Sequence, residues 1–89
     1  MLLLKQLPRY NDFLVCGISP QIHQLIKNFD ELLDEKSDDF IETGLRQSSI
    51  IRLGFLAVIP NYKLAGSIGN ISVLLHKTLL KRLGSFLMQ

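Results

Sequence analysis

Apolar residues fall into three runs of strand length and one stretch of helical period. Residues 2–4, 13–18 and 48–59 are largely apolar, and the last run is rich in isoleucine, leucine and phenylalanine. Short apolar runs of this kind are typical of buried β-strands. Gly54 interrupts the third run and predicts a bend or a β-bulge within that strand.

The segments between these runs carry residues that break regular structure. Pro8, Asn11 and Asp12 predict a loop over residues 7–12, and Pro20 ends the second strand because it has no N–H for the ladder. Residues 21–29 fit either a loop or a short helical turn, whereas residues 30–34 fit a short edge strand. The acid-rich segment that continues to Gly44 predicts a solvated loop with one helical turn at 38–42. Residues 64–71 predict a further irregular strand or a turn.

The C-terminal segment has the period of an amphipathic helix. Leucines and a phenylalanine recur at steps of three and four residues, while Lys77, Lys81 and Ser85 fall on the opposite face. Ser72 precedes this segment as an N-cap, so we expect a helix of about four turns from Val73. Several short strands followed by one helix predict an α+β, mainly β fold in which the helix packs on a small sheet or barrel.

The composition narrows the class of protein. The chain has 89 residues, enough for one domain, and 47% of them are apolar, with a mean hydropathy of +0.24. This high value indicates apolar surface buried against a second chain. No apolar stretch approaches the roughly 20 residues that span a bilayer, so we expect no membrane partner. The single cysteine, Cys16, excludes an internal disulfide and a cysteine-based zinc site, and favours a cytoplasmic location.

The charges are unevenly distributed although the net charge is only +2. Seven of the eight acidic residues lie between Asp30 and Glu42, and the chain after Glu42 carries six bases and no acid. A basic C-terminal half permits a polyanionic partner such as nucleic acid. It does not require one, because dispersed bases are common on ordinary protein surfaces.

Few side chains are suited to catalysis. His23 and His76 have no second ligand at metal-binding spacing, so we expect no metal site. For His23 the simple interpretation is a loop histidine, and the alternative is a phosphate contact or proton shuttle at the rim of the strand. Cys16 lies within an apolar run and is expected in the core. Ser19 either forms a turn or donates its hydroxyl to a phosphoryl oxygen.

Several short motifs follow one another in an order that covers essentially the whole chain. They are residues 2–4 (LLL), 13–21 (FLVCGISPQ), 43–45 with 49–53 (TGL, SIIRL), and 68–72 (IGNIS) followed by the leucine-rich helix. In order and spacing, this set resembles the MazF/PemK family of toxin endoribonucleases.

The resemblance implies a small SH3-like β-barrel with a C-terminal helix that works as a homodimer. It implies a toxin of a toxin–antitoxin system, which cuts single-stranded RNA without a metal or other cofactor and is held inactive by a cognate antitoxin. An arginine and a threonine or serine would assist attack of a ribose 2′-oxygen on the adjacent phosphate. Ser19 matches the hydroxyl residue and Gln21 a frequent polar neighbour, while His23, Arg46 and Arg52 are further candidates for substrate binding.

The chain departs from the family pattern at its beginning. The family has a first strand, a flexible loop and an Arg-Pro pair before the apolar strand, and here Met1 stands where the residue after that pair would be. We therefore expect a domain over residues 1–89 that is incomplete at its N-terminus and lacks the catalytic arginine, which neither Arg9, Arg46 nor Arg52 matches. Loss of one such charge stabiliser costs roughly 100- to 1,000-fold in rate, so we expect impaired activity.

Two other functions stay open on the sequence. One is a non-catalytic module or remnant that dimerises and binds the antitoxin, which the missing arginine favours. The other, weaker one is a protein that binds DNA or a DNA-acting enzyme, which the basic C-terminal half permits.

Overall fold

The apolar runs form a four-stranded antiparallel sheet in the computed structural model, which describes residues 1–38, 40–63 and 71–89. The strands are β1 (Leu2–Gln6), β2 (Phe13–Ser19), β3 (Glu31–Leu33) and β4 (Ser49–Ile59), in the spatial order β1-β2-β4-β3. The strands predicted over residues 2–4, 13–18, 30–34 and 48–59 are thereby confirmed, and β3 lies at an edge as expected.

Four helical segments complete the described part of the chain. Two are single 3₁₀ turns, η1 (Ile22–Gln24) and η2 (Asn61–Lys63), one is the short α1 (Phe40–Thr43), and the longest is α2 (Val73–Leu87). The Ser72 hydroxyl accepts the Leu75 N–H at 3.1 Å, which confirms the predicted N-cap. The prediction for residues 64–71 falls outside the described residues, apart from residue 71.

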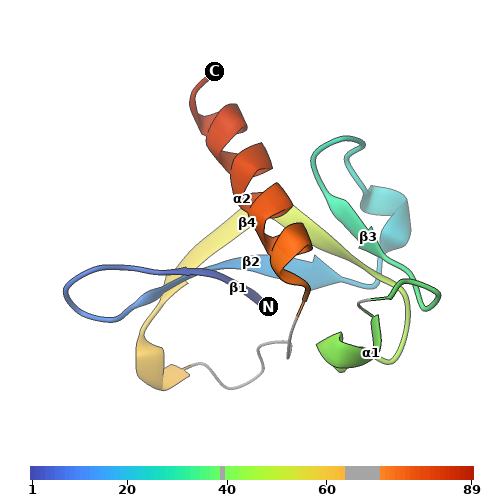
Figure 1. Ribbon diagram of the computed structural model, residues 1–89, viewed down its shortest axis with the longest axis horizontal. Coiled ribbons are helices and arrows are strands. Elements are labelled where there is room, and N and C mark those ends of the chain that lie inside the picture. The colour runs from blue at the N-terminus through green and yellow to red at the C-terminus, as the bar shows by residue number, and fades with distance from the viewer. Residues whose placement is uncertain (39, 64–70) are drawn as a thin grey trace.

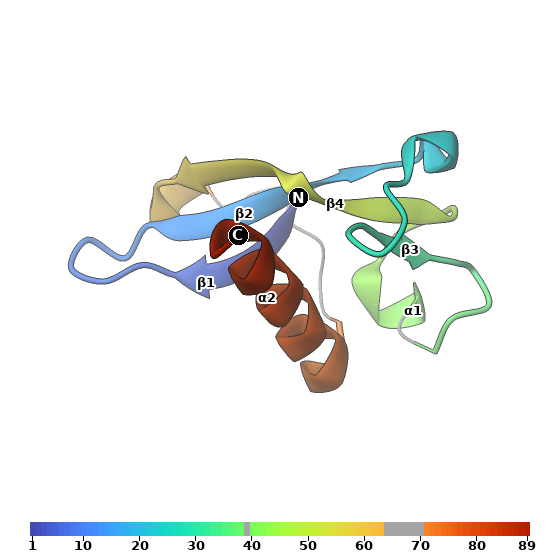
Figure 2. The ribbon, with the colours of Figure 1, turned by 90° about the horizontal axis from the view of Figure 1, so that it is seen from above.

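The curled sheet forms a half-barrel, and the C-terminal helix α2 lies across one of its faces (Figures 1 and 2). Leu79 and Leu83 of α2 belong to the same buried cluster as Cys16, Ile51 and Leu53 of the sheet. We call this side of the sheet the helix face and the opposite side the outer face. Because strand side chains alternate, Val15, Gly17 and Ser19 of β2 lie on the outer face. The α+β, mainly β class expected from the sequence is confirmed.

Cys16 is buried at the centre of the helix face, as its apolar neighbours predict. Burial raises the pKa of its thiol to about 12, because a thiolate would lose its hydration there. Cys16 is therefore a core residue and not a reactive thiol at neutral pH.

Strand β4 contains the bulge that Gly54 predicts. Arg52 pairs with Gly17 and Leu56 pairs with Cys16, so residues 53–55 have no partners on β2. Leu53 belongs to the core cluster, and Phe55 lies against Gly17 on the outer face. Gly54 thus interrupts the alternation of β4. On both sides of Gly54, successive residues of the strand alternate between the helix face and the outer face.

The acidic segment is not solvated throughout, which corrects the sequence-based expectation. Asp30 is only 5% exposed, and its carboxylate accepts the backbone N–H groups of Ile26 at 3.0 Å and Leu53 at 3.2 Å. Glu31 forms an ion pair of 2.9 Å with Arg82 of α2. Buried backbone N–H groups need acceptors, and here a carboxylate supplies them at a turn that closes onto β4.

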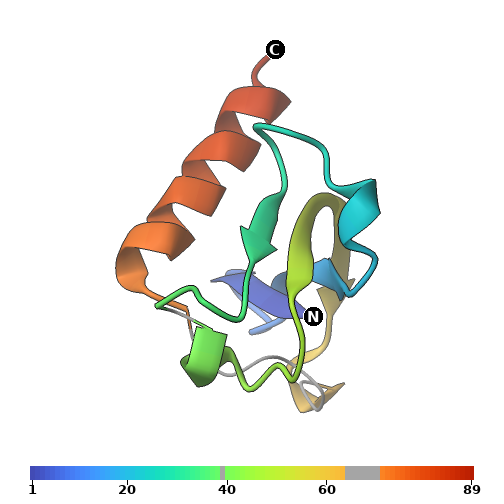
Figure 3. The same ribbon diagram turned by 90° about the vertical axis from the view of Figure 1, so that its right-hand side faces the viewer.

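Helix α2 also stands beside β3, so that β3 lies between α2 and β4 (Figure 3). The described residues include no helix of sufficient length and apolarity to cross a membrane.

Candidate functional site

Ser19 ends β2 at the rim of the sheet and is half-buried. Its Oγ accepts the backbone N–H of Gln21 at 3.1 Å. This bond forms a turn and leads the chain out of the strand, as one of the two interpretations of Ser19 predicts. The same hydroxyl keeps its proton for donation to another acceptor, so the turn does not exhaust its hydrogen-bonding capacity.

Arg52 lies on the outer face beside Ser19. In the pairing of β2 with β4, Ser19 stands opposite Ile50 and Gly17 stands opposite Arg52. Ser19 and Arg52 are therefore diagonal neighbours on one face, a relation that separates Cα atoms by about 7–8 Å and lies within reach of a long side chain. Arg52 makes no ion pair or hydrogen bond with another described side chain, so its guanidinium is available to an anion.

Phe55 completes this group. The Arg52 guanidinium carbon lies 5.4 Å from the centre of the Phe55 ring, a cation–π distance, and the ring is exposed over most of its surface. Gly17 makes room for the ring, because a Cβ atom there would stand 3.0 Å from Phe55 Cδ1 and 3.2 Å from its Cβ. We call Ser19, Arg52 and Phe55 the outer-face cluster.

The outer-face cluster brings together three different chemical groups. Arg52 supplies a permanent positive charge with paired N–H donors that suit a phosphate. Ser19 supplies a neutral O–H donor, and Phe55 supplies an exposed ring on which a base can stack. These are the contacts through which proteins hold a single-stranded nucleic acid.

Gln21 and His23 lie beyond the rim of β2. Gln21 precedes η1 and is exposed, and its backbone N–H rather than its side chain contacts Ser19. His23 is exposed in the middle of η1. No contact among the described residues joins the His23 ring to Ser19 or Arg52, so the structure does not bring this candidate into the cluster.

Arg46 lies apart from the cluster. It is exposed and lines a small pocket of about 290 Å³ together with Met1, Ile18, Pro20 and Ser49. Ile18 packs against the core cluster and therefore belongs to the helix face. The two candidate arginines thus do not form a single site, because Arg46 stands at this pocket and Arg52 on the outer face.

Among the described residues, no group of three or more His, Cys, Asp or Glu side chains could hold a metal ion. The only cysteine is buried, and the two carboxylates with the most contacts, Asp30 and Glu31, are occupied by backbone N–H groups and by Arg82.

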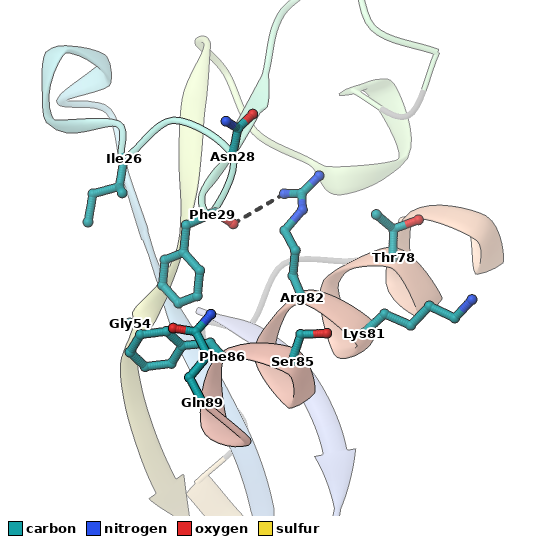
Figure 4. A pocket seen from close by; sticks show the side chains of 10 residues that line it. All are labelled: Ile26, Asn28, Phe29, Gly54, Thr78, Lys81, Arg82, Ser85, Phe86 and Gln89. Carbon is teal, nitrogen blue, oxygen red and sulfur yellow. Dashed lines mark hydrogen bonds between the residues drawn. The ribbon is translucent and has the colours of Figure 1, made fainter.

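A larger pocket of about 860 Å³ lies beside Gly54 of β4, between α2 and the turn that precedes β3 (Figure 4). The rings of Phe29 and Phe86 stand 5.1 Å apart in it, and Gly54 lies beside them. Arg82 points from α2 toward the turn, where it donates to the carbonyl oxygens of Phe29 at 3.2 Å and Asp30 at 3.3 Å.

Phe55 is the member of the cluster that sequence reasoning misses, because it counts there only as a strand former. The available signal is Gly17, a glycine inside an otherwise apolar strand, which is typical of a close approach by another group. The bulge that places Phe55 over Gly17 depends on strand register, which a single sequence does not reveal.

Comparison with protein-family models, with curated proteins and with solved structures finds no match for this chain. Function is therefore inferred from the outer-face cluster itself and from the resemblance described above.

Proposed function

We propose that the chain binds single-stranded RNA at the outer-face cluster and acts as a toxin endoribonuclease of the MazF/PemK type, with an SH3-like barrel fold. The observation that supports this proposal best is the position of Ser19 and Arg52 as diagonal neighbours on one face, beside the exposed ring of Phe55. A hydroxyl, a guanidinium and a ring together match a phosphodiester and its base.

In the proposed reaction, Arg52 serves in place of the family's catalytic arginine, which it does not match in sequence, and we expect the rate to be impaired for that reason. Arg52 binds two non-bridging oxygens of the scissile phosphate, and Ser19 donates to one of them. The ribose 2′-oxygen attacks phosphorus and loses its proton to solvent water, while the bond from phosphorus to the 5′-oxygen of the next nucleotide breaks and that oxygen takes a proton from water. The products are a 2′,3′-cyclic phosphate and a 5′-hydroxyl. The role of Arg52 is to stabilise the charge that grows on the phosphorane.

The proposal includes the partners that the resemblance implies. These are single-stranded RNA, a cognate antitoxin and a second copy of the chain, in the cytoplasm. The outer face supports a second copy, since Leu3, Phe13, Ala57 and Ile59 lie on it and are half-buried or exposed, around Val15, which is already buried within the chain. An apolar sheet face of this kind is commonly buried in an assembly.

Cleavage of a labelled single-stranded RNA by the purified chain tests the proposal. Arg52→Ala should slow cleavage by roughly 100-fold or more, as removal of one preorganised charge stabiliser does. Ser19→Ala should slow it by a smaller factor, and Arg9→Ala, at the far end of the β1–β2 loop, serves as the matched control that leaves the rate unchanged. In binding measurements, Arg52→Ala should also lower the slope of log affinity against log salt by roughly 0.7, the value for one phosphate contact on a single strand.

Absence of both binding and cleavage by the unaltered chain would contradict the proposal. Equal rates for Arg52→Ala and Arg9→Ala would move the site away from the outer-face cluster, whatever the total activity.

A second candidate is a non-catalytic module that binds RNA or an antitoxin but cleaves nothing. The Ser19 Oγ–Gln21 N–H bond favours it, because a turn fully accounts for a serine at this position. Tight RNA binding with no cyclic phosphate product, and with Ser19→Ala binding as well as the unaltered chain, would favour this candidate over the enzyme.

A further inference from the structure

The larger pocket beside α2 shares no lining residue with the outer-face cluster, so the proposed RNA chemistry does not use it. We call it the ring pocket, after the two phenylalanine rings in its wall. Its volume of about 860 Å³ lies within the range of sites that bind small molecules. Its lining includes Phe29, Gly54, Ser85, Phe86 and Gln89.

The ring pocket has an aromatic wall with an open surface. The centres of the Phe29 and Phe86 rings lie 5.1 Å apart and the rings are tilted by 53°, so they contact each other and leave no space for a molecule between them. Phe86 nevertheless remains 52% exposed. A flat molecule can therefore stack on the exposed side of this pair of rings.

Gly54 keeps the strand side of the ring pocket open. A Cβ atom at this position would lie 3.5 Å from Cε2 of Phe29, which is an ordinary contact, and a larger side chain would occupy the space beside that ring. This space is available to a ligand because residue 54 has no side chain.

The charged groups around the ring pocket already have partners. Arg82 donates to the carbonyl oxygens of Phe29 and Asp30, and its second terminal nitrogen forms the 2.9 Å ion pair with Glu31. The Asp30 carboxylate accepts two backbone N–H groups. Lys81 extends away from the rings (Figure 4). Among the described lining residues, no unpaired charged side chain therefore faces the rings, and a charged ligand would lose its hydration there without gaining a partner.

Two neutral polar side chains line the same pocket (Figure 4). Gln89 follows the end of α2, where its backbone N–H donates to the carbonyl oxygen of Phe86 at 3.2 Å, and Ser85 lies one turn earlier. Among the described residues, no hydrogen bond joins either side chain to another protein group. An amide offers both a donor and an acceptor, which suits the edge of a heteroaromatic ring better than a plain hydrocarbon.

From the ring pair, the paired charges and the free amide, we propose that the ring pocket binds a small uncharged heteroaromatic compound, of the chemical class of a nucleoside. Its flat ring stacks on Phe86 beside Gly54, and the donors and acceptors on its edge bond to Gln89 and Ser85. The compound is free and not part of a nucleic acid strand, because a strand brings a phosphate with each base and no unpaired cation among the described residues faces the rings to receive it. This inference does not depend on the proposed ribonuclease activity.

Nuclear magnetic resonance titration of the ¹⁵N-labelled chain tests the inference. The probes are adenosine, inosine, cytidine and uridine, which are uncharged at neutral pH and carry a hydrogen-bonding edge. At least one should cause saturable shifts of the Phe86 and Gln89 amides with a Kd below about 1 mM, and its ring protons should show nuclear Overhauser contacts with Phe86. No saturation by any probe at about 5 mM would overturn the proposal, as would contacts with Phe55 in place of Phe86.

Paired variants locate the bound ring. Phe86→Ala should weaken binding at least about fivefold, because the stacking surface is lost. Leu87→Ala, an exposed neighbour outside the ring pocket, should leave binding unchanged. Gly54→Leu should also weaken binding at least about fivefold, because its side chain fills the space beside Phe29 while both rings are kept. Equal binding by Phe86→Ala and Leu87→Ala, or full binding by Gly54→Leu, would overturn the proposal.

A second pair tests the polar edge. Gln89→Ala should weaken binding of the best probe about threefold, the effect of one neutral hydrogen bond. Gln24→Ala, in η1 and outside the ring pocket, should leave it unchanged. Equal affinities of these two variants would overturn the assignment of the edge to Gln89.

Charged probes test the neutral character of the ring pocket. The 5′-monophosphate of the best nucleoside should bind no more tightly than the nucleoside itself, and an eight-nucleotide uridine RNA should not displace it. Tighter binding of the monophosphate, or displacement by the RNA, would assign the ring pocket to a phosphate-bearing ligand and overturn the proposal. Arg52→Ala should have no effect on nucleoside binding, which separates this site from the outer-face cluster.

Discussion

Gly17 and Phe55 show how the absence of a side chain on one strand positions a ring on the next. The ring lies where a Cβ atom of residue 17 would otherwise stand, within 3.0–3.3 Å of three of its atoms. Its position then brings it within 5.4 Å of the Arg52 guanidinium. The arrangement of the outer-face cluster thus depends on a residue that contributes no functional group of its own.

Two glycine substitutions should have opposite effects on stability. Gly17→Ala should lower the free energy of unfolding by about 1–3 kcal/mol, because the Phe55 ring and its Cβ must move. Gly84→Ala should raise it by about 0.5–1 kcal/mol, because residue 84 lies within α2 and a Cβ there meets no atom within 4 Å. Urea unfolding measures both changes, and a stabilising Gly17→Ala would show that the ring does not occupy this position.

Cys16 should make stability depend on alkaline pH. In the folded chain its pKa is raised from 9.0 to about 12, so the folded state keeps a proton that the unfolded state loses above pH 9. This contribution to stability is complete below pH 9 and is lost as the pH rises from 9 toward 12, with a slope of roughly 1 kcal/mol per pH unit. Because lysine and tyrosine also titrate there, the measurement is the difference in slope between the unaltered chain and Cys16→Ala, which should be shallower. Identical slopes would mean that the thiol is not buried.

At the scale of elements, Asp30 fastens the turn before β3 to the middle of β4. It accepts one N–H from each, and Arg82 of α2 binds the carbonyl oxygens on the other side of the same turn. The turn before β3, β4 and α2 therefore meet at this short stretch of backbone.

Asp30→Ala should destabilise the fold by about 3 kcal/mol, because two backbone N–H groups lose a charged acceptor. Asp30→Asn should cost less, since one oxygen remains. Asp34→Ala serves as the control, because among the described residues the Asp34 carboxylate accepts just the exposed Lys36 N–H, and its loss should cost less than about 1 kcal/mol. Chemical denaturation gives all three values, and an Asp30→Ala cost no larger than that of Asp34→Ala would exclude this role.

Elements that depend on local sequence signals could be predicted from the sequence. The run of β4, the proline after β2 and the serine before α2 each act within a few residues, and each lies where local rules place it. Asp30 was not predictable in its role, because its partners Ile26 and Leu53 are set by how the turn closes on a distant strand. An acid within an acidic stretch is indistinguishable from its solvated neighbours until that closure is known.

At the scale of the whole molecule, both faces of the sheet carry apolar side chains. Helix α2 covers the helix face, and the outer face keeps a large exposed ring, Phe55, beside Arg52, which the pairing places there. Ser19 and Arg52 could each be singled out from the sequence, but their proximity could not. It follows from a register that pairs Ser19 with Ile50, and a register shifted by one residue would place the two side chains on opposite faces.

Gly54 also determines where β4 can change in length. Since Gly54 interrupts the alternation of β4, deletion of Gly54 alone would leave all the remaining side chains of the strand on the faces where they lie now. Deletion of Ala57, three positions later, would instead move the side chains of Val58 and Ile59 each to the opposite face of the sheet. Insertions and deletions in sequences that share this architecture should therefore be tolerated at the bulge and excluded from the remainder of the strand.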